Sequence, residues 1–275
     1  MLDIDGWLTA YLAVMAAVIG AVGGSFVNCL AWRTVHKEKI TRGLSHCIRC
    51  GHVLRAWDLV PVLSWALLGG KCRYCKEKIS LRYPAVELFM ACVSLAVLFR
   101  FDVSFQYLYY MGFSFLLLAE GLVDLESYEI PNRFQAASFL WWCLFLPFHA
   151  DQMVRYLADS LAGGFLIAGG LLCISLVFDR MLGRESLGGA DIKLFFITGL
   201  YLGFAVNLLN LILSCLLGLI LAAVLKAAFK RRGEKGTAAG RIADGLIPFG
   251  PAIGLSSILC VLVGSRITGW YISLF

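Results

Sequence analysis

The sequence predicts an all-α polytopic membrane protein with about eight transmembrane helices and one small polar insert between the first and second helix. Two observations indicate this class. Of the 275 residues, 60% are apolar and 15% are charged, and the mean hydropathy is +0.81. A soluble domain carries about 25% charged residues, so the composition excludes an ordinary soluble protein. In addition, apolar runs of membrane-spanning length recur along nearly the whole chain.

Each expected span is an apolar run that could cross a hydrocarbon core of about 30 Å, which takes about 20 helical residues. The expected spans are 8–32, 83–99, 104–123, 134–150, 156–178, 192–206, 207–229 and 246–270. The stretch around Asn207 leaves two possibilities, two short spans or one span with a re-entrant piece. We expect the first span to stay as an anchor, because Asp3 and Asp5 precede it and basic residues follow it, the reverse of a signal peptide.

The distribution of Lys and Arg predicts the orientation, because short cytoplasmic loops are enriched in these residues. The segments 33–82, 124–133, 179–193 and 226–245 hold 21 of the 24 basic residues, and the alternate side holds Arg100, Arg155 and Arg266. Both termini are then outside. The net charge of +6 reflects membrane topology, and nucleic acid is not an expected partner. The expected organisation is a first transmembrane helix (1–32), a cytoplasmic domain (33–82) and a seven-helix membrane domain (83–275).

The polar insert contains two CxxC pairs, Cys47 with Cys50 and Cys72 with Cys75, separated by 21 residues. Two such turns can present four thiolates to one ion, the closed tetrahedral arrangement of structural zinc sites. Disulfides or redox pairs are the alternatives, but stable disulfides are rare in the cytoplasm, where charge places the insert. His46 and His52 flank the first pair and could replace a cysteine ligand. The simpler interpretation is that both histidines are exposed polar neighbours of the cysteines.

Carboxylates near membrane spans are costly, so each one raises a functional question. Glu87, Glu120 and Asp159 lie in apolar context and favour structural pairing inside the bundle. Asp124 lies where a span gives way to a Pro-Asn turn, and Asp191 follows three small residues just before another span. The positive-charge distribution places both at the cytoplasmic boundary.

Two carboxylates held close together cannot both ionise easily, so one keeps a proton while the other activates a water. That is the chemistry of aspartyl proteases, in which the pair titrates as a unit. Two ordinary surface aspartates are the alternative that the residues alone leave open.

Several motifs resemble those of bacterial type IV prepilin peptidases, the prepilin leader peptidase/N-methyltransferases of the GxGD-type aspartyl protease class. The resemblance covers nearly the full length. The matching stretches are Gly24-Ser-Phe-Val-Asn28, Cys47 through Cys75 to Pro84-Ala-Val-Glu87, Asp124 with Ile130-Pro-Asn132, Gly188 to Lys193, and Ile247-Pro-Phe-Gly-Pro251. One departure is Ala190, which stands where the class name requires glycine; we expect tight packing to survive because alanine is small.

This resemblance implies a membrane aspartic endopeptidase of the bacterial inner membrane with its active site facing the cytoplasm. Asp124 and Asp191 are the implied catalytic pair, and Cys47, Cys50, Cys72 and Cys75 are the implied zinc ligands. The implied substrates are prepilins of type IV pili or pseudopilins of type II secretion. The second implied activity is methylation of the new N-terminus from S-adenosylmethionine, for which the sequence indicates no binding residue.

Glu126 and Glu129 form a local acidic segment beside Asp124, with Arg133 as its only cation. We expect these glutamates to bind the basic leader of the substrate, or else to be a solvated turn. A zinc-stabilised membrane scaffold or a small ion transporter is the rival from another functional class. It explains the hydrophobicity and the cysteines but does not explain the motifs around the two aspartates.

Overall fold

The computed structural model describes residues 6–39, 44–183, 187–232 and 247–274, and Asp3 and Asp5 lie outside these ranges. Within them the chain is helical, with no strand beyond two isolated β-bridges in the insert. By its internal packing the chain divides into two compact units, Met1–Phe115 and Leu116–Phe275. The division expected from the sequence, at residues 32 and 82, remains a prediction.

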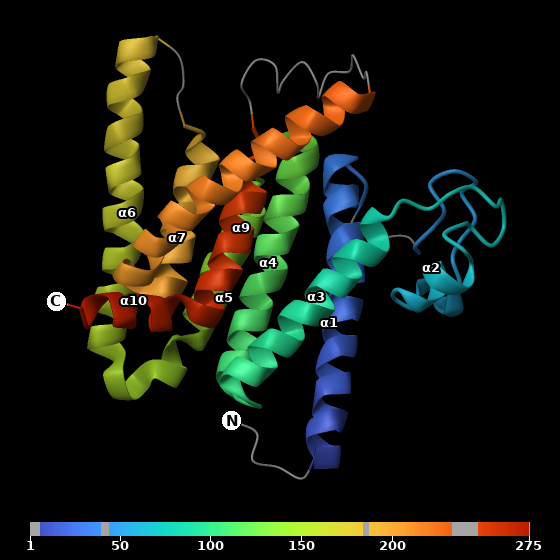
Figure 1. Ribbon diagram of the computed structural model, residues 1–275, viewed down its shortest axis with the longest axis horizontal. Coiled ribbons are helices and arrows are strands. Elements are labelled where there is room, and N and C mark those ends of the chain that lie inside the picture. The colour runs from blue at the N-terminus through green and yellow to red at the C-terminus, as the bar shows by residue number, and fades with distance from the viewer. Residues whose placement is uncertain (1–5, 40–43, 184–186, 233–246, 275) are drawn as a thin grey trace. The chain divides into compact units, whose positions relative to one another are not determined.

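The first unit is built on two long helices, α1 (Gly6–Val35) and α3 (Arg82–Phe101), followed by the start of α4 (Phe105–Ser127) (Figure 1). Small residues allow α1 and α3 to approach closely: a Cβ on Gly20 would collide with the backbone of Met90. Ser94 Oγ also donates a hydrogen bond to the carbonyl of Ala16 at 2.7 Å. The pair therefore combines close contact with an interhelical hydrogen bond.

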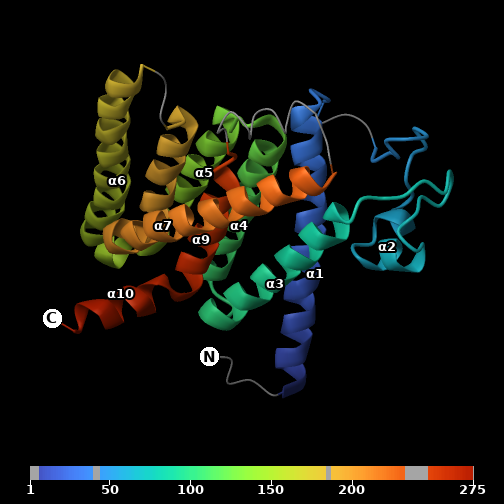
Figure 2. The same ribbon diagram turned by 45° about the horizontal axis from the view of Figure 1, so that its top comes forward.

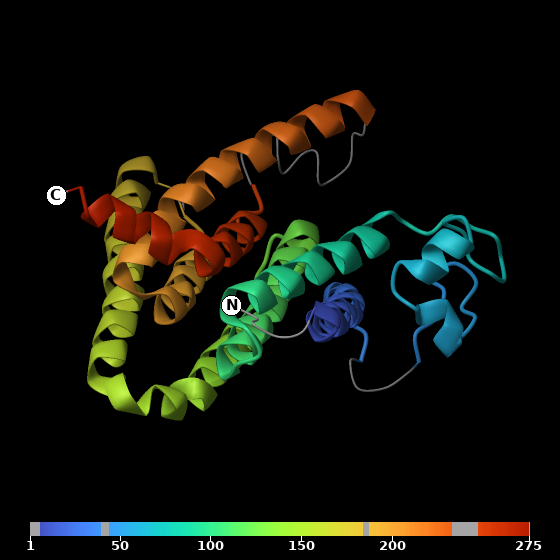
Figure 3. The ribbon, with the colours of Figure 1, turned by 60° about the horizontal axis from the view of Figure 1, so that its bottom comes forward.

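Between α1 and α3 the chain forms a small irregular domain, which we call the tetracysteine insert (residues 36–81) (Figure 3). Its only helical pieces among the described residues are the 3-10 turn η1 (Ala56–Leu59) and the short helix α2 (Leu63–Leu67). Glu87, in the first turns of α3, accepts a 2.7 Å hydrogen bond from the backbone N–H of Val62. This bond fastens the insert to the membrane helix. Glu87 has the expected structural role, but its partner lies in the insert and not inside the helix bundle.

The second unit begins within α4 and contains the rest of the helices. These are α5 (Asn132–Phe145), the 3-10 helix η2 (Leu146–Gln152), α6 (Met153–Leu182), α7 (Gly189–Arg232), α9 (Gly250–Leu259), the π-helical turn η3 (Cys260–Gly264) and α10 (Ser265–Ile272). Glycine again permits the closest approach, because a Cβ on Gly199 of α7 would collide with the backbone of Gly163 in α6.

Helix α7 is broken at Gly203, whose φ of 73° and ψ of 177° are readily adopted only by glycine. The chain doubles back there, since Asn207 Nδ2 donates to the carbonyl of Phe195 at 3.1 Å (Figure 2). Asp159 of α6 accepts the N–H of Phe204 at 3.1 Å and so caps the second segment, a structural pairing as expected. Of the two possibilities near Asn207, the structure has two helical segments.

Six described helices are long and apolar enough to cross a membrane: Gly6–Val35, Arg82–Phe101, Phe105–Ser127, Met153–Leu182, Gly189–Ala227 and Gly250–Ile272. The structure thus has fewer candidate spans than the eight that the sequence predicts, for two physical reasons. The span expected at 134–150 corresponds to α5, which has 14 residues before η2 begins. The spans expected at 192–206 and 207–229 are the two segments of α7, which are joined at Gly203. The polytopic all-α class itself is confirmed.

A buried polar network joins the two segments of α7 to α9. Thr198 Oγ1 donates to Asn207 Oδ1 at 2.9 Å, and Asn210 Nδ2 donates to the same oxygen at 3.2 Å. Ser256 of α9 donates to Asn210 Oδ1 at 2.5 Å. All four side chains are fully buried, where each hydrogen bond avoids the cost of an unpaired polar group. The network therefore fixes the position of α9 against α7.

Candidate active site and metal centre

Asp124 lies at the C-terminal end of α4, which ends at Ser127. The chain leaves the helix through Tyr128, whose φ is 60°, and Tyr128 donates its backbone N–H to the carbonyl of Asp124 at 2.9 Å. Pro131 then precedes the first residue of α5, where its fixed φ suits a helix start. These local features end the helix beside Asp124, whose side chain is only 5% exposed.

Asp191 is the third residue of α7 and is half-buried. A Cβ on Gly188 would lie 3.1 Å from Asp191 Oδ2, so a small residue at this position leaves room for the carboxylate. Ala190, the departure from the glycine pattern, is accommodated within the first turn of α7. Glycine at position 188 therefore leaves room for the Asp191 carboxylate, and tight packing at Ala190 stays a prediction.

The two aspartates are brought together within the second unit. The Asp191 carboxyl group is close enough to that of Asp124 for their negative charges to repel one another. Two side-chain hydrogen bonds tie the neighbouring segments to each other. Gln135 of α5 donates to the carbonyl of Ala190 at 2.8 Å, and Lys193 Nζ donates to Asn132 Oδ1 at 3.0 Å. The start of α5 and the start of α7, whose bonded residues are 55 and 61 positions apart in sequence, are thus held side by side.

The start of α9 completes the surroundings of Asp124. The backbone N–H of Gly250, the first residue of α9, donates to Asp124 Oδ2 at 2.8 Å. A Cβ on Gly250 would lie 2.9 Å from that oxygen, so a larger residue would displace the carboxylate. Gly121, one turn before Asp124, lies against Pro251. The Ile247–Pro251 stretch was found in the sequence only as a motif, and its contact with Asp124 is a finding of the structure.

A third carboxyl group, Glu120, lies one helical turn before Asp124 and is fully buried. Its Oε1 accepts from Ser138 Oγ at 3.3 Å, while Oε2 has no hydrogen-bond partner among the described residues. Ser138 in turn accepts the hydroxyl of Tyr201 at 2.6 Å through its carbonyl. The contact with Ser138 confirms the structural pairing expected of Glu120 inside the bundle. Glu120 is not a member of the Asp124–Asp191 pair.

The structure places Glu126 and Glu129 close to Asp124 along the chain. Glu126 is half-buried in the last turn of α4, and Glu129 is exposed in the following turn. Their position beside Asp124 is as expected. Binding of a basic leader by these residues remains a prediction.

The four cysteines of the two CxxC pairs form one cluster in the tetracysteine insert. Their sulfur atoms all lie within 4.8 Å of one another, and Cys47 Sγ and Cys75 Sγ are 3.9 Å apart. Sulfurs at the corners of a zinc tetrahedron are about 3.8 Å apart, given a Zn–S bond of about 2.3 Å. The donor set and its spacing therefore fit one tetrahedral metal ion with a closed coordination shell.

The two CxxC turns have the same local structure, with Cys72 standing 25 residues after Cys47. Each turn lies within an isolated antiparallel β-bridge, His46 with Val53 and Lys71 with Lys78. Each also has a residue of positive φ directly after its second cysteine, Gly51 at 70° and Lys76 at 61°. The sequence spacing predicts the cluster because each half is formed locally.

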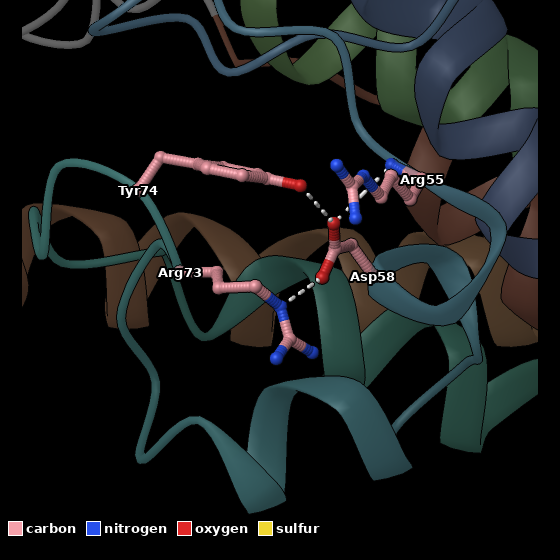
Figure 4. Close-up of polar contacts among 4 residues, drawn as sticks. All are labelled: Arg55, Asp58, Arg73 and Tyr74. Atoms are coloured by element: carbon pink, nitrogen blue, oxygen red, sulfur yellow. Dashed lines mark hydrogen bonds and ion pairs between the residues drawn. The ribbon is translucent and has the colours of Figure 1, made fainter.

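Asp58 holds the second CxxC turn in place (Figure 4). Its carboxylate accepts Arg73 Nε at 2.6 Å, the hydroxyl of Tyr74 at 3.1 Å and the N–H of Arg55 at 3.2 Å. The hydrogen bond from Arg73 is the main cause that lowers the pKa of Asp58 below its usual value. Sequence reasoning missed this residue, although it is the only acid between the two CxxC turns.

The two histidines beside the first turn lie outside the metal-ligating cluster. His46 Nδ1 lies 3.4 Å from the carbonyl of Leu44, and the ring of His52 packs on Tyr74 with centroids 3.6 Å apart. Both are polar neighbours of the cluster, which was the simpler of the two expectations.

Comparison with protein families gives two matches that together cover most of the chain. Residues 18–101 match the Bacterial Peptidase A24 N-terminal domain, and residues 110–223 match the Type IV leader peptidase family. The first match contains the tetracysteine insert, and the second contains both aspartates. No solved structure matches the chain significantly.

Three named relatives match over nearly their whole length. The chain is 30% identical to the Prepilin leader peptidase/N-methyltransferase of Pseudomonas putida, covering 94% of this chain and 93% of that protein. It is 32% identical to the protein of the same name in Bacillus subtilis strain 168, over 94% and 96% of the two chains. A Type 4 prepilin-like proteins leader peptide-processing enzyme of Escherichia coli O78:H11 is 32% identical over 95% and 97%. The resemblance stated from the motifs is confirmed, and the chain belongs to the type IV leader peptidase family.

Proposed function

We propose that this chain cleaves the basic leader from type IV prepilins or type II secretion pseudopilins, with Asp124 and Asp191 as an aspartyl peptidase pair, and methylates the new N-terminus. Family membership makes the chain a multi-pass inner-membrane peptidase that also methylates. The observation that supports the aspartyl mechanism is the meeting of two carboxyl groups from α4 and α7 beside the N-terminus of α9.

The contacts of the two aspartates favour different roles. Asp124 accepts a backbone N–H at the start of α9, and both that hydrogen bond and the helix dipole favour a negative charge. Asp124 is therefore the ionised partner. No such donor to Asp191 is found in the described structure, so Asp191 is proposed as the partner that carries the proton.

Cleavage then proceeds with the protons conserved inside the pair. Asp124 takes a proton from water as the water oxygen attacks the scissile carbonyl carbon, and Asp191 gives its proton to the carbonyl oxygen. In the second step the C–N bond breaks, and Asp124 delivers its proton to the leaving nitrogen. Asp191 recovers a proton from a hydroxyl of the tetrahedral intermediate. The pair returns to its starting state.

The substrate would reach this site from the membrane. A prepilin has a hydrophobic helix after its leader, and that helix would lie in the bilayer with the cleavage point at the membrane surface. The Lys and Arg distribution places the aspartates at the cytoplasmic surface. A scaffold or ion transporter is not favoured, since the family is one of peptidases.

Glu126 and Glu129 are proposed to receive the basic residues of the leader. Charge reversal of both (Glu126→Lys with Glu129→Lys) should lower kcat/KM about tenfold for a basic leader, because attraction becomes repulsion. A leader with its basic residues replaced by glutamine should change by less than about twofold. Cleavage assays on both substrates check this, with Glu38→Lys combined with Glu77→Lys, two exposed glutamates of the insert, as the charge-matched control. Equal losses on the two substrates would eliminate the proposal.

The tetracysteine cluster is proposed to hold structural zinc. Four cysteine ligands fill the coordination shell, so the ion would stabilise the insert and leave no open position for substrate. Asp58 would support the ion indirectly by fixing the turn that carries Cys72 and Cys75.

Methylation would require S-adenosylmethionine, and one buried group in the first unit fits a ligand. Asn28, the last residue of the Gly24–Asn28 motif, is 2% exposed, and its Nδ2 has no hydrogen-bond partner in the described part of the chain. An unsatisfied buried amide is costly, and an acceptor atom of the methyl donor would satisfy it. We therefore assign Asn28 to methyl-donor binding; the bound donor would supply the methyl group.

A two-step assay on a purified prepilin tests these activities together. Mass spectrometry should detect leader loss and then the gain of one methyl group at the new N-terminus. Asn28→Leu should cut methylation and direct binding of S-adenosylmethionine about tenfold, since one buried hydrogen bond is lost, while cleavage stays within about twofold. Intact leader with the unaltered chain would refute the peptidase proposal. Normal donor binding by Asn28→Leu would remove Asn28 from the methyl-donor site.

A further inference from the structure

The tetracysteine insert exposes an unusually apolar surface for a domain outside the membrane spans. Trp57 is 79% exposed, and on α2 Leu63 and Leu67 are 61% and 86% exposed. Leu63 and Leu67 are four residues apart and so lie on one face of α2. Leu59 and Ala66 are also exposed. We call this surface the apolar patch (Trp57, Leu59, Leu63, Ala66 and Leu67).

Exposed apolar patches of this kind usually mark a binding surface, because water contact with large apolar side chains is unfavourable. The zinc cluster does not explain the patch, since none of its residues is a candidate metal ligand. Trp65, which lies between the exposed residues, has a separate structural role: its Nε1 donates to the carbonyl of Ile79 at 3.3 Å.

The charges around the patch are positive. Residues 36–81 contain nine basic and three acidic residues, a net charge of +6. Arg55 and Lys71 flank the patch in sequence and are exposed. Asp58 is the only acid between Arg55 and Lys71, but its side chain is 4% exposed and is engaged by Arg73 (Figure 4). The patch therefore presents leucine and tryptophan to its surroundings, with an exposed cation on either side of it along the chain and no exposed acid between Arg55 and Lys71.

The position of α2 within the first unit is also informative. In Figures 1 and 2, α2 lies at the edge of the insert that points toward the N-terminal end of α1. Because α1 is a membrane-spanning helix whose C-terminal end leads into the insert, that direction is toward the bilayer. Helix α2 thus lies on the membrane side of the insert.

We infer that the apolar patch seats the tetracysteine insert on the membrane, with Trp57, Leu63 and Leu67 entering the interface of a bilayer that contains anionic lipid. Tryptophan and leucine with bordering cations are typical of interfacial segments, and anionic headgroups attract nearby Lys and Arg. The net positive charge of the insert favours an anionic lipid surface over the other possible partners. A second copy of the insert is itself basic, and the basic leader of the proposed substrate would be repelled as well.

This contact would position the first unit for its membrane-bound substrates. The insert would be held flat against the bilayer by α1 and α3 at its ends and by the apolar patch between them. The inference uses the cytoplasmic placement proposed above, where anionic lipid is encountered, but the contact itself does not require catalysis. Its test can therefore fail independently of the peptidase assay.

Photolabelling of the full chain in lipid nanodiscs tests the contact. The discs contain phosphatidylglycerol and phosphatidylcholine, with a small share of a phospholipid that carries a photoactivatable diazirine in its acyl chain. After illumination and digestion, peptides covering 56–70 should carry lipid. Leu63→Gln combined with Leu67→Gln should reduce this labelling about fivefold, because the two largest contacts of α2 lose their affinity for the interface.

The matched control replaces two other exposed apolar residues of the insert, Ile48→Gln and Val53→Gln, and should leave labelling of 56–70 unchanged. Both double variants should keep their metal content and their midpoint of thermal unfolding, which shows that the insert is folded. Discs of phosphatidylcholine alone should give weaker labelling.

Several results would overturn the inference. These are unlabelled 56–70 peptides, equal labelling in the Leu63/Leu67 variant, equal labelling without anionic lipid, or crosslinks from these peptides to a second chain or to residues 116–275 in place of lipid. A second chain would indicate self-association through the patch, and residues 116–275 would indicate that the second unit covers it.

Discussion

Asp124→Asn and Asp191→Asn should each lower the rate of leader cleavage by about a thousandfold or more, because each removes one of the two carboxyl groups that move protons in the proposed reaction. Asparagine keeps the size of aspartate, so packing against Gly250 and Gly188 is preserved. The measurement is the rate of leader loss from a purified prepilin, with the chain in lipid.

The division of roles predicts that the two variants are unequal. In Asp191→Asn the new amide would be unable to give up a proton but could still donate an N–H hydrogen bond to the carbonyl oxygen, so this variant should retain a small residual rate. Asp124→Asn should fall to background, since no base would remain for the water. In the Asp124→Asn variant the N–H of Gly250 would also face a neutral group.

Glu120→Gln is the matched control, because Glu120 is a buried carboxyl group on the same helix, one turn from Asp124. It lies outside the proposed pair and should cleave within about threefold of the unaltered chain, given that Gln can keep the contact with Ser138. Unfolding midpoints of all three variants separate catalysis from stability. Full processing by Asp124→Asn or by Asp191→Asn would end the aspartyl assignment, while the reversed order of residual rates would overturn only the roles.

The parts of this site that sequence could predict are those formed locally or carried by motifs. The cysteine cluster follows from two CxxC turns, each closed by its own backbone hydrogen bonds, such as Gly51 N–H to the carbonyl of Cys47 at 2.8 Å. The placement of the two aspartates near the ends of spans likewise follows from hydropathy and from the small or turn-forming residues beside them. A CxxC pair or a Pro-Asn turn is visible without knowing the fold.

The contacts that sequence could not predict join distant segments. Gly250 lies 126 residues after Asp124, and nothing in the local pattern shows that its N–H meets that carboxylate. Gln135 and Ala190 are a similar case, since a polar residue in an apolar helix has many possible partners. Around Asn207 one long apolar stretch leaves either two short spans or one span with a re-entrant piece, and hydropathy does not mark a break point. The structure breaks α7 at Gly203, where the backbone has a positive φ that suits glycine. Backbone conformation and long-range contact, rather than composition, determine these features.

The second large effect concerns the metal. Cys72→Ser should abolish zinc binding and unfold the tetracysteine insert, because structural zinc bound by four cysteines contributes about 10 kcal/mol or more to folding at neutral pH. The insert has little else to stabilise it: its helical pieces are four and five residues long, and Trp57, Leu63 and Leu67 are exposed. Metal analysis of the purified chain should show about one zinc per chain before the change and almost none after it.

Cys92→Ser is the control, since Cys92 is an exposed cysteine of α3 outside the cluster and its loss removes one thiol without touching a ligand. It should keep its zinc. Limited proteolysis should then cut residues 44–80 in Cys72→Ser but not in Cys92→Ser, whereas the membrane helices stay intact in both. Full zinc content in Cys72→Ser would contradict the proposed ligand set.

Zinc loss should affect cleavage less than loss of either aspartate. The Asp124–Asp191 pair and the Gly250 N–H all lie in the second unit, and the cysteines lie in the first, so the chemical groups of the reaction remain in place without zinc. A variant that retains the pair but lacks an ordered insert should therefore cut slowly, with its main defect in KM. If zinc removal instead lowered kcat as far as Asp124→Asn does, the insert would have to contribute directly to the reacting groups, and a purely structural role for the metal would be wrong.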